Sequence, residues 1–165
     1  MSAFDIRTAA SVPRAELLRF AGAVENASEH AVARAIADLA IAETGRPADV
    51  EDFRALSGLG ARGRVAGRDV LIGSVRLLAA EGMNVPPELA AVRAEWEHVG
   101  RTSVLVAVDG AVRGMIAVAD TVRPSAAAAV AELHELGLRT VLLTGTTPPR
   151  GPSPRRSASA RSSPK

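Results

Sequence analysis

The 165-residue sequence contains no cysteine and no tyrosine, and aromatic residues make up only 2% of it. The absence of cysteine excludes disulfides, thiolate catalysis and cysteine-ligated metals, and it is compatible with a reducing compartment. The shortage of aromatic rings leaves few side chains that could stack on nucleic-acid bases. With a hydrophobic content of 47%, the core must therefore be built mainly from alanine, valine, leucine and isoleucine.

Long apolar runs are also absent. The most apolar stretch, residues 103–119, is interrupted by Asp109, Gly110 and Arg113, so it falls short of the roughly 20 apolar residues that a transmembrane helix needs. Near the N-terminus, charged residues stand where a secretory signal would need an apolar run. We therefore expect no membrane span and no export signal in this chain, and a cytoplasmic location for it as an isolated chain.

Basic residues are concentrated at the C-terminal end. Residues 148–165 carry five basic side chains and no acidic one, so the net charge of +2 leaves −3 for residues 1–147. This segment is rich in proline, serine and arginine and has no apolar periodicity, which predicts a disordered tail. The pI of 10.3 reflects the lack of cysteine and tyrosine and the single lysine, so we expect no nucleic-acid partner.

The pattern of apolar residues predicts two helices near the N-terminus, followed by strands and further helices. After an N-terminal segment of residues 1–12, apolar residues at helical spacing predict a helix over 13–25. A second helix, with Ser28 as its N-cap, is predicted to end at Gly45 and to form an antiparallel pair with the first. Further along, we expect strands at 53–56, 102–108 and 112–119, helices at 75–81, 87–98 and 125–136, and an apolar strand at 140–143. Residues 64–73 are predicted to form a hairpin about a Gly67-Arg68 turn, and Asp109-Gly110 is predicted as the hairpin turn between 102–108 and 112–119.

A glycine-rich stretch follows the first predicted strand. Gly58, Gly60 and Gly63 are spaced as in GxGxxG, but a dinucleotide-binding Rossmann loop requires a helix to begin there, and a hairpin is predicted instead. A plain turn and a different kind of nucleotide-binding loop both remain open. The absence of Cβ atoms at Gly58 and Gly60 would allow the backbone to approach a ligand closely.

His30 is the second candidate feature. A single histidine beside a helix start is usually a surface or capping residue, and we interpret His98 and His134 in that way. His30 differs because Glu25 lies five residues before it and the glycine-rich stretch follows one helix and one strand later. A carboxylate can accept from an exocyclic amine, and an imidazole can stack on a base or donate to a phosphate. Together these groups could form an adenine-nucleotide pocket.

Several short motifs occur in a fixed order along residues 13–145. They are Glu25, Ser28-Glu29-His30, Gly58-x-Gly60, Val70-Leu-Ile-Gly73, Gly100-Arg-Thr102, Gly114-x-Ile116-x-Val118-x-Asp120 and Leu143-Thr-Gly145. In this order they resemble the motifs of heavy-metal-transporting P-type ATPases, and the chain looks most like the copper-transporting branch. Asp120 and Arg123 match the family's returning Asp-x-x-Arg segment, and Thr144-Gly145 matches the start of its Thr-Gly-Asp motif.

The resemblance implies an α+β fold, with a six-stranded antiparallel sheet flanked by helices, as the nucleotide-binding domain over residues 13–118. An incomplete α/β unit over 119–147, part of a haloacid-dehalogenase-like phosphorylation domain, and the tail at 148–165 would follow. It further implies that ATP, as Mg-ATP in the intact family, is the ligand. The implied site residues are Glu25 and His30, which would orient the adenine nucleotide, Gly58 and Gly60, which would shape the adjoining loop, and Gly73, which would line the same cleft.

The departures from the family are equally informative. The family's histidine is followed by proline, whereas this chain has Ala31, which does not fix φ. Ser74 occupies a position where the family often has asparagine, and Thr146 occupies the position of the aspartate in Thr-Gly-Asp. The phosphorylated Asp-Lys-Thr-Gly-Thr segment, the Cys-Pro-Cys metal site and the Gly-Asp-Gly region for Mg²⁺ are missing. Phosphoryl transfer needs an in-line nucleophile and metal, so we expect nucleotide binding without turnover.

We therefore expect an ATP-binding piece of a copper-type pump, from a truncated reading frame or a remnant whose last residues come from a shifted frame. Association with the missing pump segments stays open. One alternative is a regulatory or interaction module that kept the fold but lost nucleotide binding. Another is a haloacid-dehalogenase-like phosphatase, which would need a catalytic aspartate on the first strand of that fold.

Overall fold

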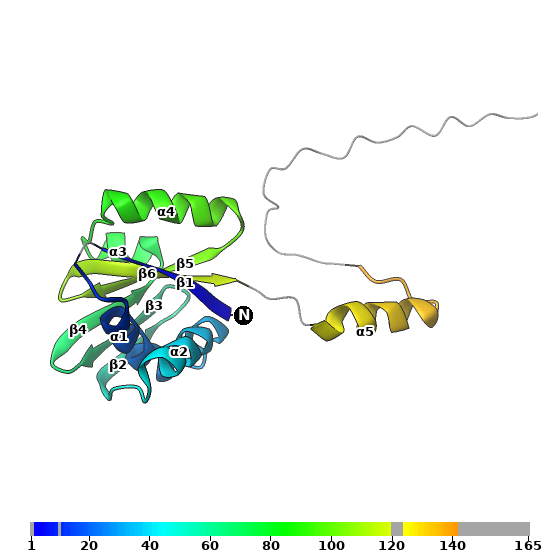
Figure 1. Cartoon of the computed structure of the whole chain (residues 1–165), viewed down its shortest axis with the longest axis horizontal. Helices are drawn as coiled ribbons and strands as arrows, with labels where there is room; N and C mark the ends of the chain where they lie inside the picture. The colour runs from blue at the N-terminus through cyan, green and yellow to red at the C-terminus, as the bar shows by residue number, and fades with distance from the viewer. Residues whose placement is uncertain (1, 10, 120–123, 142–165) are drawn as a thin grey trace, which may run out of the picture. The chain divides into compact units, whose positions relative to one another are not determined.

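The computed structural model describes residues 2–9, 11–119 and 124–141 (Figure 1). The chain divides between Arg123 and Pro124 into two units, each of which is described by itself. In the second unit the described structure is the helix α5 (Pro124–Glu135). Everything that follows on the sheet and the cavity concerns the first unit.

The first unit is built on a six-stranded sheet in the order β1-β6-β5-β4-β3-β2, in which every neighbouring pair is antiparallel. This confirms the predicted antiparallel sheet flanked by helices. The strands are β1 (Ser2–Thr8), β2 (Val50–Leu56), β3 (Gly60–Val65), β4 (Arg68–Gly73), β5 (Thr102–Val108) and β6 (Ala111–Ala119). The helices are α1 (Arg14–Asn26), α2 (Ala31–Thr44), α3 (Val75–Ala80) and α4 (Pro87–His98).

Helices cover both faces of the sheet, with α1 and α2 on one side and α3 and α4 on the other (Figure 1). The alternation of side chains along β5 divides the core accordingly. Val104 and Val106 pack in the cluster that contains α1 and α2, whereas Leu105 and Ala107 pack in the cluster that contains Leu77 and the other buried residues of α3 and α4. Because both faces are covered, the strand reads as a continuous apolar run.

The helices α1 and α2 form the predicted antiparallel pair. Arg14 in the first turn of α1 donates to both carboxylate oxygens of Glu43 in the last turn of α2, at 2.9 and 2.7 Å. Further along, Gly22 packs so closely against Ala40 that a Cβ atom at position 22 would overlap the Cβ of Ala40. The two helices can therefore pack closely at Gly22, where α1 has no side chain.

Two tight turns connect the hairpins on the sheet. The β3–β4 turn lies at Ala66-Gly67, one residue before the predicted position, and the β5–β6 turn lies at the predicted Asp109-Gly110. Both residues of each turn have positive φ, between 50° and 77°, which matches the right-handed twist of two-residue hairpins. Asp109 links the two turns, since its carboxylate accepts from Arg68 Nε at 2.7 Å and from the backbone N–H of Asp69 at 3.0 Å.

Three features differ from the sequence-based expectations. The strand β1 was not predicted, and its residues pair with β6, more than a hundred positions away. Ser28 is not the N-cap of α2, because the helix begins at Ala31 with His30 as its N-cap, and the Ser28 hydroxyl instead accepts from the His30 N–H at 3.5 Å. Of the strand predicted at 140–143, residues 140–141 have no strand structure. Residues 142–143 lie outside the described residues, as do Asp120, Arg123 and the Thr144-Gly145 motif.

The contact between Gly22 and Ala40 gives a test of the helix pair. Alanine at position 22 would ordinarily favour a helix by about 1 kcal/mol, but here its methyl group would overlap Ala40. We expect Gly22→Ala to lower the free energy of unfolding by about 1–3 kcal/mol, as measured by urea denaturation. The double variant Gly22→Ala/Ala40→Gly should recover most of this loss. A single variant as stable as the parent would contradict the close packing.

Candidate functional site

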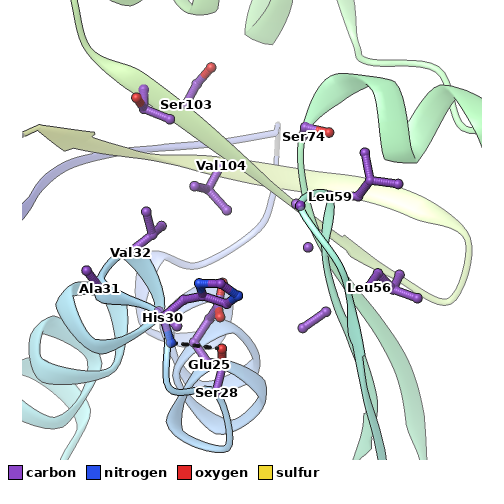
Figure 2. A pocket seen from close by; sticks show the side chains of 16 residues that line it. Glu25, Ser28, His30, Ala31, Val32, Leu56, Leu59, Ser74, Ser103 and Val104 are labelled. Atoms are coloured by element: carbon purple, nitrogen blue, oxygen red, sulfur yellow. Dashed lines mark hydrogen bonds between the residues drawn. The ribbon is translucent and has the colours of Figure 1, made fainter. Parts of the chain in front are cut away.

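All of the residues predicted for the site line one cavity of about 370 Å³. Glu25 and His30 come from the end of α1 and the start of α2, Gly58 and Gly60 from the β2–β3 connection, and Gly73 from the end of β4. Figure 2 shows the Glu25 side chain at the end of α1 and the His30 side chain just before α2, close to each other at the cavity. A volume of this size falls within the range of roughly 300–1,000 Å³ that is typical of small-molecule sites.

Glu25 is a buried carboxyl group at the wall of this cavity. It lies in the last turn of α1, and only 6% of its surface is exposed. Within the described ranges its carboxylate makes no hydrogen bond or ion pair. Burial disfavours the charged form and raises the pKa of Glu25 to about 7. An acceptor or donor on a ligand would therefore meet a carboxyl group that has no competing protein partner there.

His30 presents an exposed imidazole at the mouth of the same cavity. Its backbone is extended, with φ −67° and ψ 145°, and its side chain does not cap the helix that begins at Ala31. The hydrogen bond from its N–H to the Ser28 hydroxyl is drawn in Figure 2. Because this bond involves the backbone, the ring remains available to a ligand.

Gly60 and Gly73 face each other across β3 and β4 and allow the two strands to meet at the cavity. A Cβ atom at Gly60 would overlap the carbonyl oxygen of Ile72 and lie 2.7 Å from the Cα of Gly73. At Gly73 it would overlap the carbonyl oxygen of Leu59 and lie 2.9 Å from the Cα of Gly60. These two positions therefore require glycine because backbone atoms occupy the space on both sides.

Gly58 has a different role. Its φ of +69° lies in the left-handed region, and a Cβ atom at this position would have no neighbour within 4 Å. The residue is therefore needed for the turn between β2 and β3 rather than for packing. Its open surroundings leave the backbone of the turn accessible from the cavity.

The sequence reading missed the part of the cavity that β5 supplies. Thr102, Ser103 and Val104 line it, together with Leu56 and Leu59 around the glycine turn. The pairing of β4 with β5 ends at Gly73 and Leu105, so β5 extends past the end of β4 at these three residues. The Gly100-Arg-Thr102 motif marked this region of the sequence, but only the register of the sheet places it beside Glu25 and His30.

Chemically, the cavity combines an apolar interior with a few polar groups at defined positions. Val32, Leu56, Leu59 and Val104 supply the apolar surface, and the carboxyl group, the imidazole and the exposed backbone of the glycine turn supply the polar groups. Such a combination suits a flat heteroaromatic ring that also carries hydrogen-bond donors and acceptors. Among the described residues no group of three or more His, Asp or Glu side chains could hold a metal ion.

Comparisons with known proteins define the class of the chain. The family model of haloacid dehalogenase-like hydrolases matches residues 5–156, and the chain therefore belongs to this family. Within it, the sheet and helices of the first unit correspond to the N-domain region of heavy-metal P-type ATPases, which confirms the resemblance inferred from the motifs.

The relatives make this assignment specific. The chain is 47% identical over 133 residues to the copper-exporting P-type ATPase of Mycobacterium tuberculosis (strain ATCC 25618 / H37Rv), a match that covers 81% of this chain and 17% of the relative. The chain thus spans about a sixth of the length of this relative. None of the helices in the described ranges is long and apolar enough to cross a bilayer.

Solved structures share the fold. A zinc-transporting PIB-type ATPase in the E2.Pi state is 36% identical, with a TM-score of 0.67 over 89% of this chain and 23% of that chain. The N-domain of HMA8, a copper-transporting P-type ATPase, is matched over its full length and over 72% of this chain, with 22% identity and a TM-score of 0.59. A third match is the catalytic domain of the CPx-ATPase CopB-B, whose structure describes conformational changes upon nucleotide binding. It is 20% identical, with a TM-score of 0.51, and the match covers 83% of this chain and 43% of that chain.

The burial of Glu25 predicts a pH-dependent stability. Its pKa is about 7 in the folded protein against 4.5 for an ordinary glutamate, so folding disfavours the ionised form. The contribution of Glu25 to the free energy of unfolding is therefore fully present below about pH 4.5 and is lost as the pH rises through about 7. It amounts to at most about 3 kcal/mol. We expect the difference in unfolding free energy between the parent and Glu25→Gln to change over this window in urea denaturation. A difference independent of pH would contradict a buried, titrating Glu25.

Proposed function

We propose that the chain binds an adenine nucleotide, with ATP as the physiological ligand, in the cavity between Glu25, His30 and the glycine turn. The observation that carries the proposal is that Glu25, His30, Gly58, Gly60 and Gly73, which come from separate segments of the sequence, line a single cavity of suitable size. The correspondence to the N-domain region of P-type ATPases supports the same conclusion, as does the nucleotide-dependent change described for the CopB-B catalytic domain.

The residues suggest how the base is held. The exocyclic amine of adenine donates hydrogen bonds, and a ring nitrogen accepts one, so a carboxyl group at the wall can pair with this edge in either protonation state. Glu25 has no competing partner in the described structure, so pairing with the base would relieve the penalty of burying an unpaired polar group. The exposed ring of His30 would stack on the base or contact the ribose from the open side.

We further propose that this chain binds nucleotide without hydrolysing it by itself. No Asp-Lys-Thr-Gly-Thr segment occurs in its sequence, and no described cluster of side chains could hold a metal ion. We propose metal transport, with copper as the transported ion, only for a complete pump. In such a pump this region would lie on the cytoplasmic side of the membrane. The phosphatase alternative finds no support in the first unit, because its described strands form only antiparallel pairs.

The binding proposal is tested by titrating ATP against the protein in calorimetry. We expect His30→Ala and Glu25→Ala each to weaken binding about tenfold, since each removes one polar or stacking contact worth on the order of 1.4 kcal/mol. Glu29→Ala and His98→Ala are matched controls, because both side chains are exposed and neither lines the cavity. If all four variants bound ATP like the parent, the cavity would not be the nucleotide site.

The absence of proline after His30 gives a second test. The residue before a proline must be extended, and His30 already has φ −67° and ψ 145°. Position 31 is the first residue of the helix, where proline is favoured. We expect Ala31→Pro to raise the free energy of unfolding by about 0.4–1 kcal/mol and to tighten ATP binding by fixing the His30 backbone.

A control for this substitution is Ala42→Pro, at an exposed position in the last turn of α2. Proline there removes a helical hydrogen bond and clashes with the preceding turn, at a cost of about 3 kcal/mol. Thermal unfolding separates the two effects. A loss of stability in Ala31→Pro comparable to that in Ala42→Pro would show that His30 does not hold its described backbone conformation.

A further inference from the structure

A second, smaller cavity adjoins the first on the opposite side of the sheet. Its volume is about 240 Å³, and it shares Ser74, Thr102 and Ser103 with the first cavity. Arg93 and Glu97 of α4 and Arg101 in the loop before β5 complete its polar wall. The function proposed above uses none of these last three residues.

The sheet itself provides the connection between the two cavities. Pairing between β4 and β5 stops at Gly73, and from Ser74 the chain turns away into α3, so the start of β5 has no strand beside it on that side. Ser103 alternates with Val104 along β5 and therefore faces the α3 and α4 side. In Figure 2 its hydroxyl points away from Glu25 and His30. The shared residues Ser74, Thr102 and Ser103, called the passage residues below, thus lie between the two cavities at the end of β4.

The arginines of the second cavity supply hydrogen-bond donors for an anion. Two guanidinium groups and one carboxylate line it. Arg93 Nη1 contacts Glu97 Oε1 at 2.7 Å, and Arg101 Nη1 lies 3.7 Å from Asp5 Oδ2. A guanidinium has five N–H donors, so these contacts leave donor capacity on Arg93, whose Nε has no hydrogen-bond partner in the described structure. Both arginines are half-buried, with 25% and 35% of their side chains exposed, which limits screening by salt.

We propose that this second cavity receives the phosphate end of the nucleotide whose base occupies the first. The inference rests on the proposed nucleotide binding and adds to it a phosphate subsite built from Arg93, Arg101 and the hydroxyl groups of the passage residues. Guanidinium groups and hydroxyls are suited to phosphate oxygens, because the planar fork of arginine matches two oxygens at once. The carboxylate of Glu97 repels the phosphate group and lowers the affinity of the cavity for it.

The test compares ATP with adenosine, which has no phosphate, by calorimetry in the presence of EDTA. We expect Arg93→Gln to weaken ATP binding about tenfold, equivalent to about 1.4 kcal/mol, and to leave adenosine binding unchanged. Glu97→Gln should act in the opposite direction and tighten ATP binding while also leaving adenosine unaffected. Arg64→Gln is the matched control, because Arg64 is exposed and lines neither cavity.

The outcomes separate this inference from the proposed function. Opposite shifts for Arg93→Gln and Glu97→Gln with ATP alone would support the phosphate subsite. An unchanged ATP affinity in both variants, or equal changes for ATP and adenosine, would overturn the subsite and leave the base-binding cavity intact. Failure of the parent protein to bind either compound would overturn the proposed function and this inference together. Thermal unfolding of each variant verifies that the fold is retained.

Discussion

The close approach of the β3 and β4 backbones at Gly60 and Gly73 is the constraint on which the cavity depends. A side chain at either position would overlap a carbonyl oxygen of the facing segment. With both side chains absent, β4 ends beside the glycine turn, and Ser74 can immediately cap α3 by accepting from the Leu77 N–H at 3.3 Å. The same ending of β4 leaves the start of β5 uncovered. The wall of the cavity that the sheet supplies thus depends on this one pair of residues.

The end of α1 and the start of α2 supply the opposite wall, and the two groups proposed there to contact the nucleotide are in contrasting environments. The Glu25 carboxyl group is buried without a protein partner, whereas the His30 ring is open to solvent. A core position of this kind would be more stable with an apolar residue, because burying an unpaired polar group is unfavourable. Retaining a carboxyl group there is the pattern expected of a site in which function competes with stability.

Local patterns predicted most of the fold because most of its elements are specified locally. The bounds of α4 and β5 were predicted from the local sequence, with β5 recognised by its β-branched residues, and Asp109-Gly110 identified its hairpin, because these signals lie within a few residues. The strand β1 was not predicted because its partner β6 lies at the other end of the unit. Ser28 was wrongly predicted as a cap because the same hydroxyl can bond a backbone N–H two residues ahead in a turn. Neither the burial of Glu25 nor the contribution of β5 is visible without the sheet register.

The pairing of β1 with β6 has a consequence for how the first unit would be attached to any neighbouring domain. Ser2 is opposite Ala119 in the register, so the polypeptide enters and leaves this unit through adjacent strands. Two adjacent connections of this kind act as a narrow hinge, about which a unit can swing as a rigid body while its sheet stays intact. A rotation about these connections would leave the strands and helices that line the cavity in their relative positions.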